Sequence, residues 1–245
     1  MRKEKLTILS NLPVAAAIWR LELATEDPGR EVDGEFVHLS VPGHFLRRPL
    51  SLCEVNPGRI TLLYKIVGEG TRTLASLPEG TILDALTDLG HGFHPEACRQ
   101  EALLIGGGLG AAPLYLLARR LKAAGKSVTA VLGFNRVEEV VLDAAFCTLC
   151  DRVEMTTLDG SAGRKGFVTD ALEVLELRYD YFYTCGPMVM MKAVCALLPG
   201  SGEASLEERM GCGCGICYGC SIPTAQGPRR VCADGPVFKK EDLSW

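Results

Sequence analysis

The chain has 245 residues, of which 47% are hydrophobic and 23% are charged, and its formal net charge is -4. This composition is typical of a soluble globular protein with two modest domains and a small appendage. A weakly negative chain without a dense basic block gives no reason to expect nucleic-acid binding, and no apolar stretch is long enough for a membrane span. Asn11 and Pro13 interrupt the apolar run at residues 6–19, so we expect no signal peptide and a cytoplasmic location.

Residues 1–97 contain short strand-like runs separated by Gly, Pro, Asn and Asp. The runs are Ala15–Ala24, Glu35–Val41, Leu50–Val55, Arg59–Val67 and Thr81–Leu86. Regular short strands with turn residues between them predict a small antiparallel β-barrel or sandwich.

From residue 98 to residue 200, apolar strands alternate with helices. The expected strands are Ala102–Ile105, Ser127–Leu132, Arg152–Thr157 and Tyr181–Thr184, and the expected helices are Ala112–Ala124, Val137–Phe146, Thr169–Leu177 and Met188–Leu197. Continuous apolar strands are typical of a parallel sheet that is buried on both faces. The alternation predicts a doubly wound α/β domain, followed by a small cysteine-rich subdomain at residues 201–245.

A glycine-rich turn follows the first strand of the α/β domain and contains Gly106, Gly107, Gly108 and Gly110. Glycines let a pyrophosphate approach backbone N–H groups closely, and the N-terminus of the next helix adds a partial positive charge. The turn therefore predicts a nucleotide-phosphate site, although it only approximates the usual G-x-G-x-x-G pattern.

The last strand of this domain ends in Cys185, Gly186 and Pro187 and passes directly into a helix. This arrangement places a small ledge of backbone at the carboxyl edge of the sheet, where open α/β folds bind ligands. An ordinary strand-to-helix turn is the alternative.

Four cysteines near the C-terminus have the spacing C-x4-C-x2-C, then eleven residues, then C. They are Cys212, Cys217, Cys220 and Cys232. This is the plant-type ferredoxin pattern, in which four thiolates hold a 2Fe–2S cluster and glycines let the loop wrap around it. Cys214 lies off this spacing and is not counted as a ligand.

Two other interpretations of the cysteines are weaker. A structural zinc site normally has two short Cys pairs, whereas here three cysteines share one loop. Eleven cysteines is an odd number, and six of them are scattered through apolar runs as buried residues are, which argues against a disulfide framework. The Cys147-x2-Cys150 pair has no second pair beside it.

The barrel region contains Arg47-Arg48-Pro49-Leu50-Ser51 and, later, Gly68-Glu69-Gly70-Thr71. An arginine before a proline and a hydroxyl residue can bind a phosphate on a fixed backbone. On the chemistry alone, a solvated basic turn and a hairpin loop explain these residues better.

In chain order, the Arg48–Ser51 segment, the Gly68–Thr71 loop, the glycine turn and the Cys185–Pro187 corner resemble the ferredoxin–NADP reductase superfamily. With the cysteine loop and the closing segment Asp234-Gly235-Pro236-Val237-Phe238, nearly the whole chain resembles the electron-transfer subunits of NAD-dependent (class 1B) dihydroorotate dehydrogenases.

The resemblance implies that the N-terminal barrel binds FAD, that the α/β domain binds NAD, and that the four spaced cysteines ligate a 2Fe–2S cluster. The implied FAD contacts are Arg48, Pro49, Leu50, Ser51, Leu63, Tyr64, Lys65, Gly70 and Thr71. The implied partner is an FMN-containing catalytic subunit that oxidises dihydroorotate to orotate in pyrimidine biosynthesis, with two copies of each subunit. Electrons would pass through the cluster and FAD to NAD, because a flavin exchanges either one or two electrons.

We expect no general acid or base on this chain. Cys185 and Gly186 are expected near the nicotinamide, with a merely buried Cys185 as the alternative. The segment at residues 157–161 lacks a Ser-Arg pair for a 2′-phosphate, and Asp159 would repel one, which favours NAD over NADP.

The chain departs from the family pattern at Asp33-Gly34-Glu35-Phe36, where Pro-Gly-Gln-Phe is usual, and at Thr87-Asp88-Leu89-Gly90, where Gly-Pro-Leu-Gly is usual. Two other functions remain as alternatives. One is a related FAD/2Fe–2S subunit of an NADP transhydrogenase, sulfide dehydrogenase or hydrogenase complex, and the other is a non-enzymatic metal-sensing module.

Overall fold

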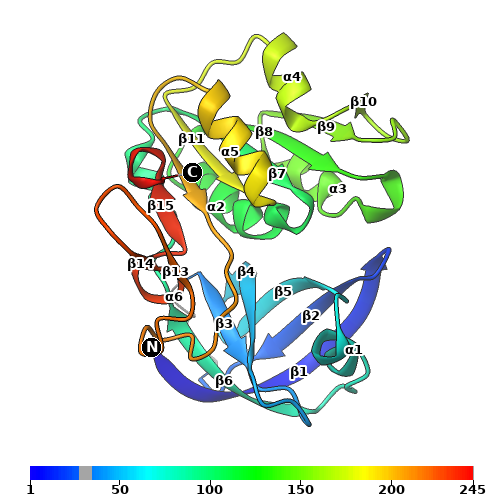
Figure 1. Cartoon of the computed structure of the whole chain (residues 1–245). Helices are drawn as coiled ribbons and strands as arrows, with labels where there is room; N and C mark the ends of the chain where they lie inside the picture. The colour runs from blue at the N-terminus through cyan, green and yellow to red at the C-terminus, as the bar shows by residue number, and fades with distance from the viewer. Residues whose placement is uncertain (28–34, 245) are drawn as a thin grey trace. The chain divides into compact units, whose positions relative to one another are not determined.

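The computed structural model describes residues 1–27 and 35–244, so Asp33 and Gly34 of the first departure lie outside the described residues. The chain divides into two compact units, whose elements are labelled in Figure 1. The barrel unit comprises Met1–Gly92, Glu207–Ile222 and Pro228–Pro236, and the sheet unit comprises Phe93–Leu206, Pro223–Gly227 and Val237–Trp245. The cysteine-rich segment therefore folds mainly with the barrel.

In the barrel unit, six antiparallel strands close in the order β1-β2-β5-β4-β3-β6 (Figure 1). The strands are β1 (Arg2–Ala15), β2 (Ile18–Ala24), β3 (Phe36–Leu39), β4 (Arg48–Asn56), β5 (Arg59–Lys65) and β6 (Ile82–Leu89). Buried and more exposed residues alternate along β6, and Leu6, Leu21 and Leu62 of the other strands are fully buried. The predicted antiparallel barrel is confirmed, and its closure leaves no unpaired strand edge.

Helix α1 (Glu69–Ala75) follows β5 and begins at the segment that the sequence indicates as a hairpin loop. Thr71 caps this helix, because its hydroxyl accepts the N–H groups of Val67 at 3.0 Å and Gly68 at 3.3 Å and donates to the Gly68 carbonyl at 3.0 Å. Leu74 is fully buried and fixes the helix to the barrel.

The sheet unit contains a seven-stranded sheet in the order β10-β9-β8-β7-β11-β12-β15, in which only β15 is antiparallel. The strands are β7 (Glu101–Gly107), β8 (Ser127–Phe134), β9 (Arg152–Thr157), β10 (Arg164–Lys165), β11 (Tyr181–Cys185), β12 (Gly202–Ser205) and β15 (Val237–Lys239). The order of strands reverses at β7, which has β8 on one side and β11 on the other. Such a switch point creates a ligand-binding crevice at the carboxyl ends of the strands.

Helices cover both faces of this sheet, which confirms the predicted doubly wound architecture (Figure 1). The α-helices are α2 (Ala111–Ala123), α3 (Asp143–Leu149), α4 (Val168–Val174) and α5 (Met188–Leu197), and the 3-10 helices are η1 (Pro95–Ala97), η2 (Gly108–Gly110), η3 (Val137–Glu139) and η4 (Lys240–Asp242). The single helix expected at residues 137–146 is wrong. Leu142 has a φ of 62°, and this left-handed residue separates η3 from α3.

The cysteine-rich segment has little regular structure. It contains a two-stranded sheet of β13 (Ser221–Ile222) and β14 (Arg229–Arg230) and the short helix α6 (Val231–Asp234). None of the helices in the described part of the chain is long and apolar enough to cross a bilayer.

Candidate functional site

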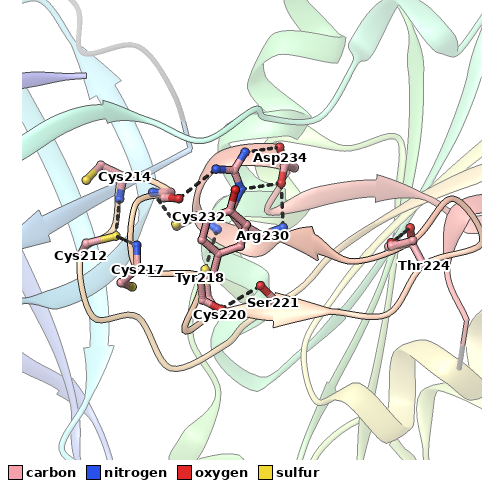
Figure 2. Close-up of polar contacts among 12 residues, drawn as sticks. Cys212, Cys214, Cys217, Tyr218, Cys220, Ser221, Thr224, Arg230, Cys232 and Asp234 are labelled. Atoms are coloured by element: carbon pink, nitrogen blue, oxygen red, sulfur yellow. Dashed lines mark hydrogen bonds and ion pairs between the residues drawn. The ribbon is translucent and has the colours of Figure 1, made fainter.

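The sulfur atoms of all four predicted ligand cysteines accept hydrogen bonds from backbone N–H groups, several of which are drawn in Figure 2. Cys212 Sγ accepts two, from Cys214 at 3.5 Å and from Cys217 at 3.4 Å. The other three sulfurs accept one each: Cys217 from Gly219 at 3.4 Å, Cys220 from Cys232 at 3.4 Å, and Cys232 from Gly215 at 3.2 Å. Backbone donors directed at sulfur stabilise thiolates, the form in which cysteine binds iron.

The electrostatic state of these thiols differs along the loop. Burial raises the pKa of the Cys212 thiol, but the N–H groups of Cys214 and Cys217 act in the opposite direction and lower it to about 6. Burial, together with the neighbouring Cys220 thiol, raises the pKa of Cys232 to about 12. Because metal ligands bind as thiolates, loading the site must release the Cys232 proton.

The thiols lie close enough to affect one another's ionisation: Cys212 interacts with Cys217 and with Cys214, and Cys232 interacts with Cys220 and, more weakly, with Cys212. Within residues 1–27 and 35–244, no three His, Cys, Asp or Glu side chains converge closely enough to hold one metal ion. A structural zinc site places four ligands around one ion, whereas a cluster with two irons takes two thiolates per iron. The spacing of the four cysteines, with no one-ion site among the described residues, is therefore compatible with a two-iron cluster.

One side of the cysteine loop is exposed and the other is buried. Cys220 and Cys232 are each 2% exposed, whereas Cys217 lies on the surface between Ile216 and Tyr218. Burial and the nearby Cys212 thiol also raise the pKa of Cys214, which lies off the ligand spacing.

Arg230 holds the loop in place, and sequence reasoning missed this residue (Figure 2). Its Nε and Nη2 donate to the two carboxylate oxygens of Asp234, both at 3.0 Å, and its Nη1 donates to the Gly215 carbonyl at 2.9 Å. Its guanidinium also lies 5.0 Å from the centre of the Tyr218 ring. Gly215 is the residue whose N–H reaches Cys232, so Arg230 positions a donor to a ligand sulfur. The four-residue spacing of Arg230 and Asp234 is the signal that could have found it.

We expect Arg230→Gln to lose its cluster roughly tenfold faster than the wild type, at the low end of the range for groups that support metal ligands. Hydrogen bonds from Arg230 lower the pKa of Asp234 to about 2. The ion pair is therefore fully formed at pH 7 and is lost only as the pH falls towards 2. The measurement is the decay of cluster absorbance during incubation with a chelator at pH 7. Arg229→Gln, at the neighbouring exposed position, is the control, and equal decay in both variants would contradict the assignment.

The two phosphate-binding segments expected in the barrel unit meet at Arg48 and Gly70. A Cβ atom on Gly70 would lie 2.1 Å from Nη2 of Arg48, so a larger residue there would displace the guanidinium. No carboxylate in the described part of the chain pairs with Arg48. Arg47 differs, because its guanidinium pairs with the Asp84 carboxylate and donates to the Asp84 carbonyl at 2.8 Å.

The other expected flavin residues have different surroundings. Pro49, Leu50 and Ser51 of β4 are half-buried and open to a ligand. Tyr64 is 1% exposed and donates its hydroxyl to Asn11 Oδ1 at 2.9 Å, whereas Leu63 and Lys65 lie on the other face of β5. The Thr71 hydroxyl is occupied by its helix cap.

The glycine turn at the carboxyl end of β7 borders a cavity of about 400 Å³ in the sheet unit. Gly107, Gly108 and Pro187 line this cavity, together with Phe134 and Leu158 from the ends of β8 and β9. Gly108 has a φ of 55° and open space where a Cβ would point. No side chain caps the N-terminus of α2, although the Ala111 N–H bonds to the carbonyls of Gly108 and Leu109 in η2.

The two nucleotide segments predicted from the sequence lie against each other. A Cβ on Gly110 would be 2.1 Å from the Cys185 carbonyl oxygen, and a Cβ on Gly186 would be 2.9 Å from the Gly107 nitrogen. Gly106 pairs with Cys185 across β7 and β11. Cys185 itself is only 2% exposed.

Asp159 lies in an exposed turn directly after Leu158, which lines the cavity. Its Oδ1 accepts the N–H of Ser161 at 2.9 Å and the Ser161 hydroxyl at 2.6 Å. These two hydrogen bonds lower the pKa of Asp159, so its negative charge persists at neutral pH.

A closed barrel, a nucleotide-type parallel sheet and a loop with four thiols together define an electron-transfer oxidoreductase. The model of an iron–sulfur cluster binding domain of dihydroorotate dehydrogenase B matches residues 207–244, and that of an oxidoreductase NAD-binding domain matches residues 104–196. The chain is similar to electron transfer subunits of dihydroorotate dehydrogenase B (NAD(+)) from Bacillus mycoides (strain KBAB4) and Bacillus anthracis (strain A0248). Each is 39% identical to it over an alignment of 252 residues, gaps included, that covers 97% of this chain and 97% of the relative.

Solved structures agree with these matches. The structure of an NADH-dependent reduced ferredoxin–NADP oxidoreductase superposes with a TM-score of 0.89 at 30% identity, covering 98% of this chain and 90% of that chain. Phthalate dioxygenase reductase shares the fold at 22% identity, with a TM-score of 0.66 over 80% of this chain and 64% of its own. The chain belongs to the family of dihydroorotate dehydrogenase B (NAD(+)) electron transfer subunits.

Proposed function

We propose that this chain carries electrons from an FMN-containing catalytic subunit, which oxidises dihydroorotate to orotate, through a 2Fe–2S cluster and FAD to NAD. The observation that carries the proposal is that backbone N–H groups are directed at all four spaced thiols, three in the loop and Cys232 in α6, in the same compact unit as the Arg48–Gly70 contact. When bound, the flavin would collect two electrons from the cluster one at a time and, with a proton from solvent, would supply the hydride that NAD accepts. In this proposal residues 1–97, 98–200 and 201–245 are the FAD, NAD and cluster domains.

The cysteine ligands act as two pairs. Cys212 and Cys217 would bind one iron, and Cys220 and Cys232 the other, following their order in the chain. The backbone N–H groups of the loop would then stabilise the thiolates and the sulfides of the cluster.

The residues of the barrel unit would hold FAD mainly through its phosphates. Arg48 would bind a phosphate next to Gly70, and Pro49, Leu50, Ser51, Leu63 and Lys65 would line the site. Tyr64 would not contact FAD through its hydroxyl, which bonds to Asn11 and so stabilises β5. Thr71 would act indirectly, because its hydroxyl fixes the backbone at the start of α1.

The sheet unit would bind NAD at the switch point of its strands. The pyrophosphate would lie on the Gly106–Gly110 turn and the N-terminus of α2, and the Cys185–Pro187 ledge would border the nicotinamide. The chain's own role in hydride transfer is then to orient the nicotinamide, without a general acid or base.

The exposed side of the cysteine loop suggests where the catalytic subunit docks. Ile216 is 79% exposed and Tyr218 is 65% exposed, and both flank the ligand Cys217. Electron transfer needs short distances, so we propose that the partner covers this part of the loop. We further propose two copies of each subunit and a cytoplasmic location, where thiols stay reduced.

The second candidate is a subunit of a bifurcating NADP transhydrogenase, which the 30% identical structure of a reduced ferredoxin–NADP oxidoreductase supports. The 39% identity to dihydroorotate dehydrogenase subunits over nearly the whole chain favours the first. The test is co-expression of the chain with its catalytic partner, followed by assay of dihydroorotate-dependent NAD reduction. Activity with ferredoxin and NADP, but not with dihydroorotate and a competent partner, would overturn the proposal.

Asp159 provides a test of the preference for NAD. We expect Asp159→Asn to lower the ratio of NADH to NADPH use by no more than about fivefold, because an exposed charge is screened by water and salt. The amide oxygen can still accept the Ser161 hydrogen bonds, so the turn is retained. The measurement is kcat/KM for both nucleotides with an artificial electron acceptor.

Ser161→Ala is the matched control, because it removes the hydroxyl hydrogen bonds to Asp159 and from the Val137 N–H but keeps the charge of Asp159. We expect its nucleotide preference to equal that of the wild type. A larger change in Ser161→Ala than in Asp159→Asn would assign selectivity to the shape of the turn and not to its charge.

A further inference from the structure

His38 on β3 is a buried imidazole whose hydrogen-bonding groups have no partner among the described residues. Its side chain is 0% exposed, and both Nδ1 and Nε2 lack a hydrogen bond. Buried polar groups in folded proteins are almost always satisfied, so an orphaned pair of ring nitrogens indicates that a group facing the ring comes into hydrogen-bond geometry in another state of the site. Neither the cluster ligands nor the flavin segment, as described above, uses this residue.

The ring packs directly against the backbone of the cysteine loop. A Cβ on Gly213 would lie 2.3 Å from His38 Nδ1, and Gly213 follows the ligand Cys212. Gly213 also has a φ of 70°, so both its conformation and its contact with the imidazole require glycine. His38 is therefore the barrel side chain on which the first part of the cluster loop rests.

The same ring also faces the flavin segment. The carbonyl groups of Arg47 and Cys212 both approach its nitrogens without reaching hydrogen-bond geometry. The Arg47 guanidinium, in turn, donates to the His38 carbonyl at 3.4 Å. An imidazole carries at least one N–H donor in either protonation state, so the ring can donate to a group that faces it.

We propose that His38 is a positioning residue for the cluster, whose ring N–H donates a hydrogen bond to the Cys212 segment when the cluster is bound and so helps to set the cluster's reduction potential. This inference rests on the proposed function. Hydrogen bonds around the ligand sulfurs are among the main determinants of iron–sulfur potentials, and groups behind metal ligands also fix ligand orientation. Because His38 contacts the loop next to Cys212, the effect should reach the cluster before it reaches FAD or NAD.

The test compares His38→Phe, which removes both nitrogens, with His38→Gln, which keeps a donor. In the complex with the catalytic subunit, we expect His38→Phe to shift the cluster potential to a more negative value and to change the g-values of the reduced cluster in electron paramagnetic resonance. His38→Gln should restore most of both properties. The rate of FAD reduction by NADH should stay within about twofold of the wild type, because that step does not use the cluster.

His44→Phe is the matched control, because His44 Nε2 bonds to Thr73 Oγ1 at 2.9 Å on α1 and does not contact the cysteine loop. A second measurement needs no variant. Only four histidines occur in the chain, and with ¹⁵N-labelled histidine the reduced wild-type cluster should show a weak ¹⁵N coupling in pulsed electron paramagnetic resonance.

An unchanged potential and unchanged g-values in a fully loaded His38→Phe complex would overturn the inference, as would the absence of a ¹⁵N coupling in the labelled wild type. An equal shift in His44→Phe would do the same. These results differ from a failure of the proposed function, which would appear as a wild-type protein that lacks a cluster or does not transfer electrons from dihydroorotate.

Discussion

Cys232→Ser is expected to produce a protein that keeps its flavin but holds no intact cluster. Cys232 is 2% exposed, adjoins Cys220 and receives the Gly215 N–H, so its sulfur cannot be replaced by a neighbouring surface group. A serine hydroxyl gives up its proton far less readily than a thiol and binds iron poorly. We expect dihydroorotate-dependent NAD reduction to fall by at least about 100-fold. Substitution of a group that only supports a metal ligand already lowers metal affinity or activity by about 10- to 100-fold.

The same variant should still reduce an artificial acceptor with NADH at close to the wild-type rate, because that reaction needs only FAD and NAD. Cys214→Ser is the matched control, since Cys214 lies in the same loop but outside the ligand spacing. Iron and acid-labile sulfide per flavin would be measured in both variants. Full iron content in Cys232→Ser, or loss of iron in Cys214→Ser, would show that the ligand set is wrong.

The parts of the molecule that depend on local sequence could be predicted. The spacing of Cys212, Cys217 and Cys220 within one loop is a local property, and the structure directs backbone N–H groups at each of these sulfurs. The strands β7 and β11 were also predicted, because each contains a short continuous apolar run, which is typical of a strand buried on both faces of a parallel sheet. Whether the predicted FAD and NAD contacts bind these molecules stays a prediction.

The elements that sequence reasoning missed depend on tertiary contacts. Strand β1 begins with alternating charges, and Glu4 is nevertheless buried, where it accepts a hydrogen bond from Thr87 of β6. Strand β15 joins the edge of the parallel sheet from a distant part of the chain, through pairing with β12. No local pattern contains either pairing.

Two supporting residues of the cluster loop were missed for the same reason. His38 lies in a strand that reads as ordinary barrel core, and its contact with Gly213 spans most of the chain. Arg230 belongs to a basic pair that looks like a solvated turn, and only the fold brings it to Gly215. Sequence motifs thus identify residues that contact a cofactor more readily than residues that position those contacts.

Arg48→Ala is expected to yield protein that has lost most of its FAD while keeping its cluster. The guanidinium lies on the backbone of Gly70 and has no carboxylate partner in the described part of the chain, so its charge is available to a phosphate. A hydrogen bond to a charged group is worth about 1.5–3 kcal/mol, which corresponds to roughly 10- to 150-fold weaker flavin binding. Fluorescence titration of the deflavinated protein with FAD would measure this change.

Gly70→Ala tests the same contact from the other side, because its Cβ would displace the guanidinium without removing it. If the two groups act together, the double variant should bind FAD no more weakly than Arg48→Ala alone. Arg47→Gln is the control, because Arg47 is bound to Asp84 within the barrel; it should lower the melting temperature without selective loss of FAD. Full flavin affinity in Arg48→Ala, or additive losses in the double variant, would mean that the phosphate is bound elsewhere in the barrel unit.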